Sequence, residues 1–234
     1  KNKALYIGIS SLLLLSTLGG AAGAKSSEAR TTNRSNLIAA APAKDNSSVT
    51  KKEFKVGSFD TVNIKGGFRA ILKQGSGPKV VVECNKNSLE KVKVGVKDGA
   101  LNIYTAPNFN ASAAALEITT PKLARLNTSG FVTARVLQYK GGNLEINGHN
   151  SSTVESTGSV DKLLVSCDGK AYLNLNKLIS KECVANVADQ SFAKLYASNT
   201  ISASAKGKSV INVSGNPRVL KKNIASTSFF KVNK

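Results

Sequence analysis

Four carboxylates in the second half of the sequence are the side chains best suited to acid–base chemistry: Glu155, Asp161, Asp168 and Asp189. Glycoside hydrolysis needs two carboxylates that face one cleft. Asp168 and Asp189 stand near the same bend of consecutive sequence repeats, so they could lie close together. Asp189, however, occupies a turn position where Asp has a structural reason to stand, and no long insertion builds a cleft. An enzyme acting on acidic polysaccharide therefore remains an alternative, with no residue assigned as catalytic.

The other reactive side chains are three cysteines and a single histidine: Cys84, Cys167, Cys183 and His149. No Cys-x-x-Cys pair accompanies the single His, so we expect no metal site and no cofactor. After export, one disulfide and one free thiol could form, and Cys167–Cys183 is a conceivable pair. Cys167 also falls on an inward strand position. We therefore expect a buried core residue there, not a thiolate nucleophile paired with His149, which is expected at a surface bend.

Basic residues greatly outnumber acidic ones, with 33 Lys and Arg against 14 Asp and Glu. Residues 52–234 alone hold 26 basic and 12 acidic residues. Such a surface attracts polyanions. Outside the cytoplasm these would be lipopolysaccharide, teichoic acids, acidic glycans or extracellular DNA, although a basic surface that only aids solubility is the alternative. The candidate polyanion-binding residues are Lys206, Lys208, Arg218, Lys221 and Lys222.

A short repeat between residues 126 and 232 would position these side chains. Each copy begins with a small or apolar residue, has Gly, Asp or Ser two places later, and has an apolar residue eight places later. The copies begin at Thr128, Ile146, Cys167, Val187, Ala205 and Ile224, which are 18 to 21 residues apart. Apolar and polar residues alternate around each start, which indicates a strand with one buried face. The third position marks a bend.

A period near twenty residues is typical of one turn of a β-solenoid. A single strand–bend–strand unit cannot bury its own apolar face, whereas stacked units bury a continuous core. Small residues at inward positions suit a narrow cross-section: Thr128, Ala185, Ala203 and Ala205. The pattern therefore predicts an all-β solenoid of short strands with about 18–21 residues per rung. An antiparallel β-sandwich is the alternative fold.

Three regions are expected along the chain. Residues 1–24 resemble an export signal, with a basic start, an apolar run and a small-residue cleavage site. The apolar run is shorter than the roughly 20 residues of a spanning helix, so no transmembrane segment is expected after signal removal. Residues 25–51 are polar and are expected to form a disordered spacer. Residues 52–234 are expected to form one solenoid domain.

Within that domain, the strand-like segments of residues 52–120 are spaced differently from the repeated rungs expected over 121–234. Asp98-Gly99 between alternating apolar runs predicts a β-hairpin. A solenoid also needs protected ends. We expect the segment 54–104 to cap one end and Phe229-Phe230 to cap the other or to contact a partner.

Several segments resemble one bacterial family in their order: 54–64, 94–103, the Ser-Gly bends, and Ser214-Gly215-Asn216-Pro217. The family is the putative auto-transporter adhesin, head GIN domain family, a domain of unknown function, and the resemblance covers about residues 53–234. It implies an exported bacterial protein with a right-handed β-helix-like fold and an adhesin role. It brings no catalytic residues. The chain departs from the family's Gly-Ser-Gly bends at 167–169 and 187–189.

Together these features favour an exported, non-enzymatic β-solenoid that binds surfaces, anionic polymers or glycans. The expected location is the periplasm, the outer cell surface or the extracellular space. The first alternative is a structural or assembly module of the envelope that binds another protein by its coil ends. A cytoplasmic nucleic-acid role conflicts with the export signal, and few aromatic residues interleave the lysines for base stacking.

Overall fold

The computed structural model describes residues 49–105 and 114–233, which all lie in one compact unit. The expected signal peptide and residues 25–48 of the expected spacer lie outside the described residues. The last three residues of the spacer segment belong to a strand. The elements are β1 (Val49–Phe54), β2 (Thr61–Gly66), β3 (Phe68–Gln74), β4 (Lys79–Asn85), α1 (Lys86–Leu89), β5 (Val92–Lys97), β6 (Ala100–Thr105), β7 (Ala114–Thr120), β8 (Arg125–Gly130), β9 (Thr133–His149), β10 (Thr153–Cys167), β11 (Tyr172–Val187), β12 (Phe192–Ala205), β13 (Val210–Ser214), β14 (Arg218–Ile224) and β15 (Phe229–Val232).

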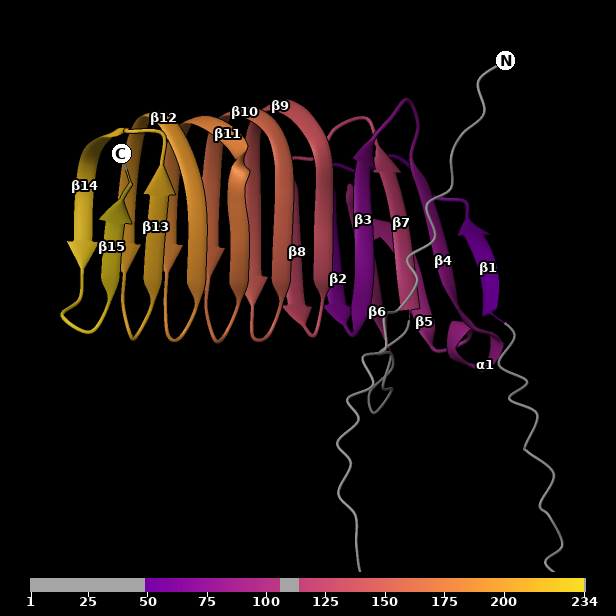
Figure 1. The fold of residues 1–234 in the computed structure, drawn as a ribbon. Helices are drawn as coiled ribbons and strands as arrows, with labels where there is room; N and C mark the ends of the chain where they lie inside the picture. Colours follow the sequence, from indigo (N-terminus) through magenta and orange to yellow (C-terminus); the bar gives the residue numbers. More distant parts are fainter. Residues whose placement is uncertain (1–48, 106–113, 234) are drawn as a thin grey trace, which may run out of the picture. The chain divides into compact units, whose positions relative to one another are not determined.

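From β8 onward the chain winds as a parallel coil, so the predicted β-solenoid is confirmed and the antiparallel sandwich is excluded. Each long strand, β9 to β12, bends midway. Its first half belongs to one ladder of parallel strands and its second half to another. We call these the first ladder, which ends with β13 and β15, and the second ladder, which ends with β14. Figure 1 shows the strands following one another along the stack.

The register corrects one of the predicted repeat starts. Thr128 pairs with Gly148, and Gly148 pairs with Cys167, so the second copy begins at Gly148 and not at Ile146. The third position of that copy is Asn150, with φ 60°. Asn adopts the left-handed conformation more readily than most other non-glycine residues. The predicted pattern allowed only Gly, Asp or Ser at the third position. It therefore assigned that position to Gly148, two residues before Asn150.

The left-handed bend position forms a column along the coil. Gly130, Asn150, Gly169, Asp189 and Gly207 all have positive φ. A Cβ atom on Gly169 would lie 2.8 Å from Asn150 Cα, and one on Gly207 would lie 2.7 Å from Asp189 Cα. Side chains are thus tolerated on alternate turns of this column, because each glycine makes room for the residue of the turn before it.

The N-terminal strands enter the same stack out of sequence order. β2 lies between β6 and β8 in the second ladder, and β3 lies between β7 and β9 in the first. The parallel stack therefore starts before residue 121, where the sequence pattern placed its beginning. The strand spacing of residues 52–120 differs because the chain leaves the coil after β3. It returns through the predicted hairpin at Asp98-Gly99, which joins β5 and β6.

The two ends of the stack differ. At the N-terminal end, antiparallel strands close both ladders, with β4 and β1 on one and β5 on the other. This agrees with the cap expected from residues 54–104. At the C-terminal end, β14 pairs with β12 and β15 pairs with β13, and in the described part of the chain each has one open edge. Figure 1 shows β14 and β15 at the end opposite β1.

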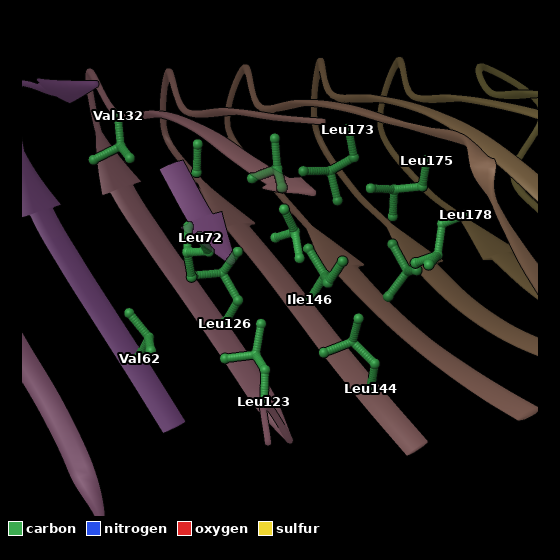
Figure 2. Packing of buried hydrophobic residues seen from close by; sticks show 14 of the residues in the cluster. Val62, Leu72, Leu123, Leu126, Val132, Leu144, Ile146, Leu173, Leu175 and Leu178 are labelled. Atoms are coloured by element: carbon green, nitrogen blue, oxygen red, sulfur yellow. The ribbon is translucent and has the colours of Figure 1, made fainter. Parts of the chain in front are cut away.

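The core runs through the coil between the ladders. Leu126, Ile146 and Leu173 are fully buried, and Figure 2 shows their side chains gathered in the interior. Burying one Leu or Ile side chain contributes about 1.5–3 kcal/mol. The small residues predicted to point inward are buried too: Thr128, Ala185, Ala203 and Ala205. No helix among residues 49–105 and 114–233 has the length and apolar character needed to cross a bilayer.

Candidate functional site

The five candidate polyanion-binding residues lie in the last two turns of the coil. Lys206 and Lys208 stand in the turn between β12 and β13, and Arg218, Lys221 and Lys222 belong to β14; all five side chains are exposed. They form two groups, one at the turn edge and one on the terminal strand of the second ladder. We call them together the basic end.

A β-bulge sets the direction of the terminal cations. Val219 pairs with Ile201, but the next pair is Lys221 with Ser202, so Leu220 is an extra residue. Lys222 consequently pairs with Ala203, a position that points into the core in earlier turns. Because no described strand stacks beyond β14, this inward position is open. The Lys222 ammonium lies 5.4 Å from the centre of the Phe230 ring, where it covers part of the end of the core.

The basic end lies in a stretch of sequence without acidic residues, and Asp189 lies on the adjacent turn, beside Gly207. Residues 190–234 contain eight Lys and Arg and no Asp or Glu. Near the other end, lysines have partners: Lys73 Nζ lies 2.9 Å from Glu117, and Lys79 Nζ lies 2.8 Å from Glu53. Lys73 is the main reason that the pKa of Glu117 is lowered. Among the described residues, no salt bridge involves the basic end.

Two of the candidate catalytic carboxylates stand on consecutive turns, as expected. Asp168 Oδ2 lies 2.9 Å from His149 Nδ1, and Asp189 Oδ2 accepts a hydrogen bond of 3.1 Å from the backbone N–H of Gly169. His149 is half-exposed where β9 ends, in agreement with the expected surface bend. The contact of Asp189 stabilises the adjacent turn, which is the structural reason expected for an Asp there.

The other two carboxylates are held in ion pairs on the coil surface. Asp161 Oδ1 lies 2.7 Å from Lys181 Nζ, and Glu155 Oε2 lies 3.1 Å from Arg135 Nε. A surface hollow of about 860 Å³ lies elsewhere. It is lined by Lys73, Gln74, Gly75, Pro121, Leu137, Gln138 and Thr157. The four candidates therefore do not line it, and each has a partner that accounts for its position.

The conceivable Cys167–Cys183 disulfide is wrong, because both thiols are free and buried. Cys183 pairs in register with Leu163, four residues before Cys167 on β10. At about 3.3 Å per residue, the two cysteines are roughly 13 Å apart along the strand direction, whereas a disulfide joins Cα atoms about 4.4–6.8 Å apart. Burial raises the pKa of the Cys167 thiol to about 11, which is the opposite of an activated nucleophile.

The described residues hold no cluster of three or more His, Cys, Asp or Glu side chains that could bind a metal ion.

The family model for the putative auto-transporter adhesin, head GIN domain, matches residues 58–217. The chain belongs to this family. The head GIN domain match includes the basic turn at Lys206 and Lys208 and ends one residue before Arg218. The description of the family supports an adhesin-like role for its members. No curated protein matches the chain.

Solved structures share the fold of this head GIN domain. One is described as a putative adhesin from Bacteroides fragilis NCTC 9343, with a TM-score of 0.63, 16% identity, and coverage of 80% of this chain and 97% of that one. Another is described as a putative lipid binding protein from Parabacteroides distasonis ATCC 8503, with a TM-score of 0.53, 18% identity, and coverage of 81% and 98%. At these identities the likeness concerns the fold alone.

Two rows of outward-facing side chains on the head GIN domain were not predicted from the sequence. Asn147 Nδ2 donates to Asn127 Oδ1 at 2.8 Å, and Asn127 Nδ2 donates to Asn63 Oδ1 at 2.6 Å, which forms an amide ladder. On the first ladder, the rings of Tyr172 and Phe192 stack. The repeat period itself carried the signal, because Asn127 and Asn147, like Tyr172 and Phe192, are twenty residues apart. Comparing outward positions between repeats would have revealed both rows.

Proposed function

We propose that this protein is an exported, non-enzymatic adhesin-like domain that binds anionic polymers or glycans through its basic end. Its place of action would be the periplasm, the outer cell surface or the extracellular space. The observation that carries the proposal is the absence of any Asp or Glu from residues 190–234, which contain eight basic residues. The five exposed cations of the basic end form no salt bridge among the described residues, which leaves them available to a ligand.

Physical reasoning supports a local site over general basicity. Screening at physiological salt limits charge effects to about 8 Å. Cations upstream, such as Lys73 and Lys79, share that distance with carboxylates, so their fields partly cancel. Among the described residues, the cations of the basic end form no ion pair with a carboxylate. A polymer with repeated negative charges can contact both the turn edge and β14, which makes several weak contacts act together.

The test compares two variants with the same loss of net charge. One replaces Lys206, Lys208, Arg218, Lys221 and Lys222 by Gln. The matched control replaces five exposed lysines near the other end by Gln: Lys55, Lys65, Lys86, Lys97 and Lys122. Binding of residues 25–234 to polygalacturonate, polyphosphate and neutral dextran is measured at low and at physiological salt.

We expect the first variant to bind polyanions at least about tenfold more weakly than the control, because five contacts of about 0.2–1 kcal/mol each are lost. The control should stay near the original protein, and neutral dextran should not bind. Equal weakening of both variants, or binding that vanishes at physiological salt, would mean that only overall charge attracts the polymers and would refute a site at the basic end.

Exposed apolar residues favour a second candidate function, that of an envelope assembly module. Val219 and Leu220 on β14 are 39% and 57% exposed, and Phe229 on β15 is 54% exposed, all beside open strand edges. Such edges can accept a strand from another chain. This function predicts a complex with one envelope protein that resists salt and is lost in Leu220→Lys, while polyanion binding by that variant is retained.

A further inference from the structure

An outward-facing aromatic row crosses the first ladder near its C-terminal end. Tyr172 pairs in register with Phe192, Phe192 with Val210, and Val210 with Phe229. We call these four residues, three aromatic and one valine, the aromatic row. Their side chains lie on consecutive strands, β11, β12, β13 and β15, which follow one another along the stack in Figure 1. Neighbouring strands are about 4.7–4.9 Å apart, so the row presents a flat, regularly spaced apolar strip.

The rings are arranged as an accessible platform. The centroids of Tyr172 and Phe192 are 5.5 Å apart, with 19° between the ring planes. Both residues are half-buried, whereas Phe229 is 54% exposed. Because the aromatic row points away from the core, its exposed surface remains in contact with water unless a ligand covers it.

A polar row runs beside the aromatic row, two residues further along each strand. Asn174 pairs with Lys194, Lys194 with Asn212, and Asn212 with Lys231, so amide and ammonium groups alternate from strand to strand. The Lys194 ammonium lies 5.7 Å from the centre of the Phe192 ring and 6.0 Å from that of Tyr172. No salt bridge among the described residues involves Lys194, so its N–H donors are available to a ligand anion.

This combination selects a ligand with apolar ring faces, carboxylates and hydroxyl groups in a repeating order. We propose that the aromatic row and the adjacent polar row bind an acidic polysaccharide built of carboxylated pyranose units. The apolar faces of the sugar rings would pack on Tyr172 and Phe192. Lys194 and Lys231 would bind the carboxylates, and the amide of Asn212 would bind hydroxyl groups.

The inference rests on the proposed function and deepens it by naming the ligand class and a second contact surface. A linear polyphosphate has the charge but no ring face, so it would gain nothing from the aromatic row. A neutral polysaccharide has the ring faces but offers no partner for Lys194 and Lys231. Acidic polysaccharide satisfies both rows at once.

The test removes the rings and keeps the strands. Tyr172→Thr with Phe192→Thr replaces two outward rings by a residue that strands accommodate well. The matched control is Tyr104→Thr with Phe131→Thr, which removes one Tyr and one Phe that are 50% and 79% exposed elsewhere. Lys194→Gln is the third variant. Binding to polygalacturonate, polyphosphate and neutral dextran is measured, and thermal unfolding identifies any variant that has lost its fold.

We expect the Tyr172/Phe192 variant to bind polygalacturonate about tenfold more weakly and polyphosphate within twofold of the original protein. The control should change neither, and Lys194→Gln should weaken polygalacturonate binding severalfold. An unchanged affinity for polygalacturonate, or equal losses for both polyanions, would overturn the inference. If the original protein binds polyphosphate and not polygalacturonate, this inference fails while the proposed function stands. If it binds neither, both fail.

Discussion

The backbone N–H of Gly169 donates a hydrogen bond of 3.1 Å to Asp189 Oδ2, which joins two consecutive turns of the coil at their bend. Asp189 itself has φ 60°. One residue thus meets two requirements: it adopts the left-handed conformation and it provides a hydrogen-bond acceptor to the neighbouring turn. The first prediction separates these contributions.

Asp189→Ala should lower the free energy of unfolding by about 2–3 kcal/mol, because Ala is strained in the left-handed region and cannot accept the hydrogen bond. Asp189→Gly should lose only the bond and cost about 1 kcal/mol. Asp189→Asn should stay closest to the original protein. Urea unfolding measures all three, and an Ala variant as stable as the Gly variant would show that the backbone strain argument is wrong.

A buried hydroxyl offers a stabilising substitution. Ser156 is 2% exposed, pairs in register with Val136, and its Oγ has no hydrogen-bond partner among the described residues. Ser156→Ala should therefore raise the free energy of unfolding by about 1 kcal/mol. The control is Ser152→Ala, since the buried Ser152 Oγ accepts a 3.1 Å hydrogen bond from Thr128. That change should destabilise the protein by about the same amount, and urea midpoints of the same sign for both would contradict the prediction.

The stability contribution of Glu145 should depend on pH. The hydrogen bond that Asn147 donates to Glu145 Oε1, 2.7 Å long, is the main cause that lowers the pKa of Glu145 from 4.5, and Arg125 acts in the same direction against partial burial. A lowered folded-state pKa stabilises the protein above the unfolded value, and this stability is lost as the pH falls through the folded value. Glu145→Gln should therefore be less stable at pH 7, with the difference shrinking below about pH 4.5.

Thermal unfolding from pH 7 to pH 3 checks this prediction. Glu90→Gln is the control, because Glu90 is exposed and takes part in no salt bridge among the described residues. A difference between Glu145→Gln and the original protein that stays constant over the whole range would show that the charge of Glu145 does not stabilise the fold.

Three slow-reacting thiols are expected in the folded protein. Burial raises the pKa of Cys167 to about 11 and of Cys183 to about 12, and it also raises the pKa of Cys84. Since the thiolate is the reactive form, a thiol reagent at pH 8 should react slowly with the native protein and quickly with three groups in denaturant. One reactive group in denaturant without reductant would instead reveal a disulfide.

Apolar–polar alternation and turn residues correctly predicted the strands, the Asp98-Gly99 hairpin and the inward small residues. These patterns failed where two residue types can both adopt the left-handed backbone conformation. Asn150 takes the left-handed conformation that the pattern reserved for Gly, and this shifted one repeat by two residues. They also missed the entry of β2 and β3 between later strands, because pairing between distant segments leaves no periodic signal in either segment.

The sequence by itself determined that this protein forms a solenoid. From Leu126 onward its alternating apolar residues recur about every twenty residues, and stacking one strand turn per repeat buries them. It also determined the strong excess of positive charge. The tertiary structure alone decided which charges form salt bridges and which rings stand side by side. Tyr172 and Phe192 become neighbours only when the coil closes. Such contacts depend on register between turns, which chain position does not encode directly.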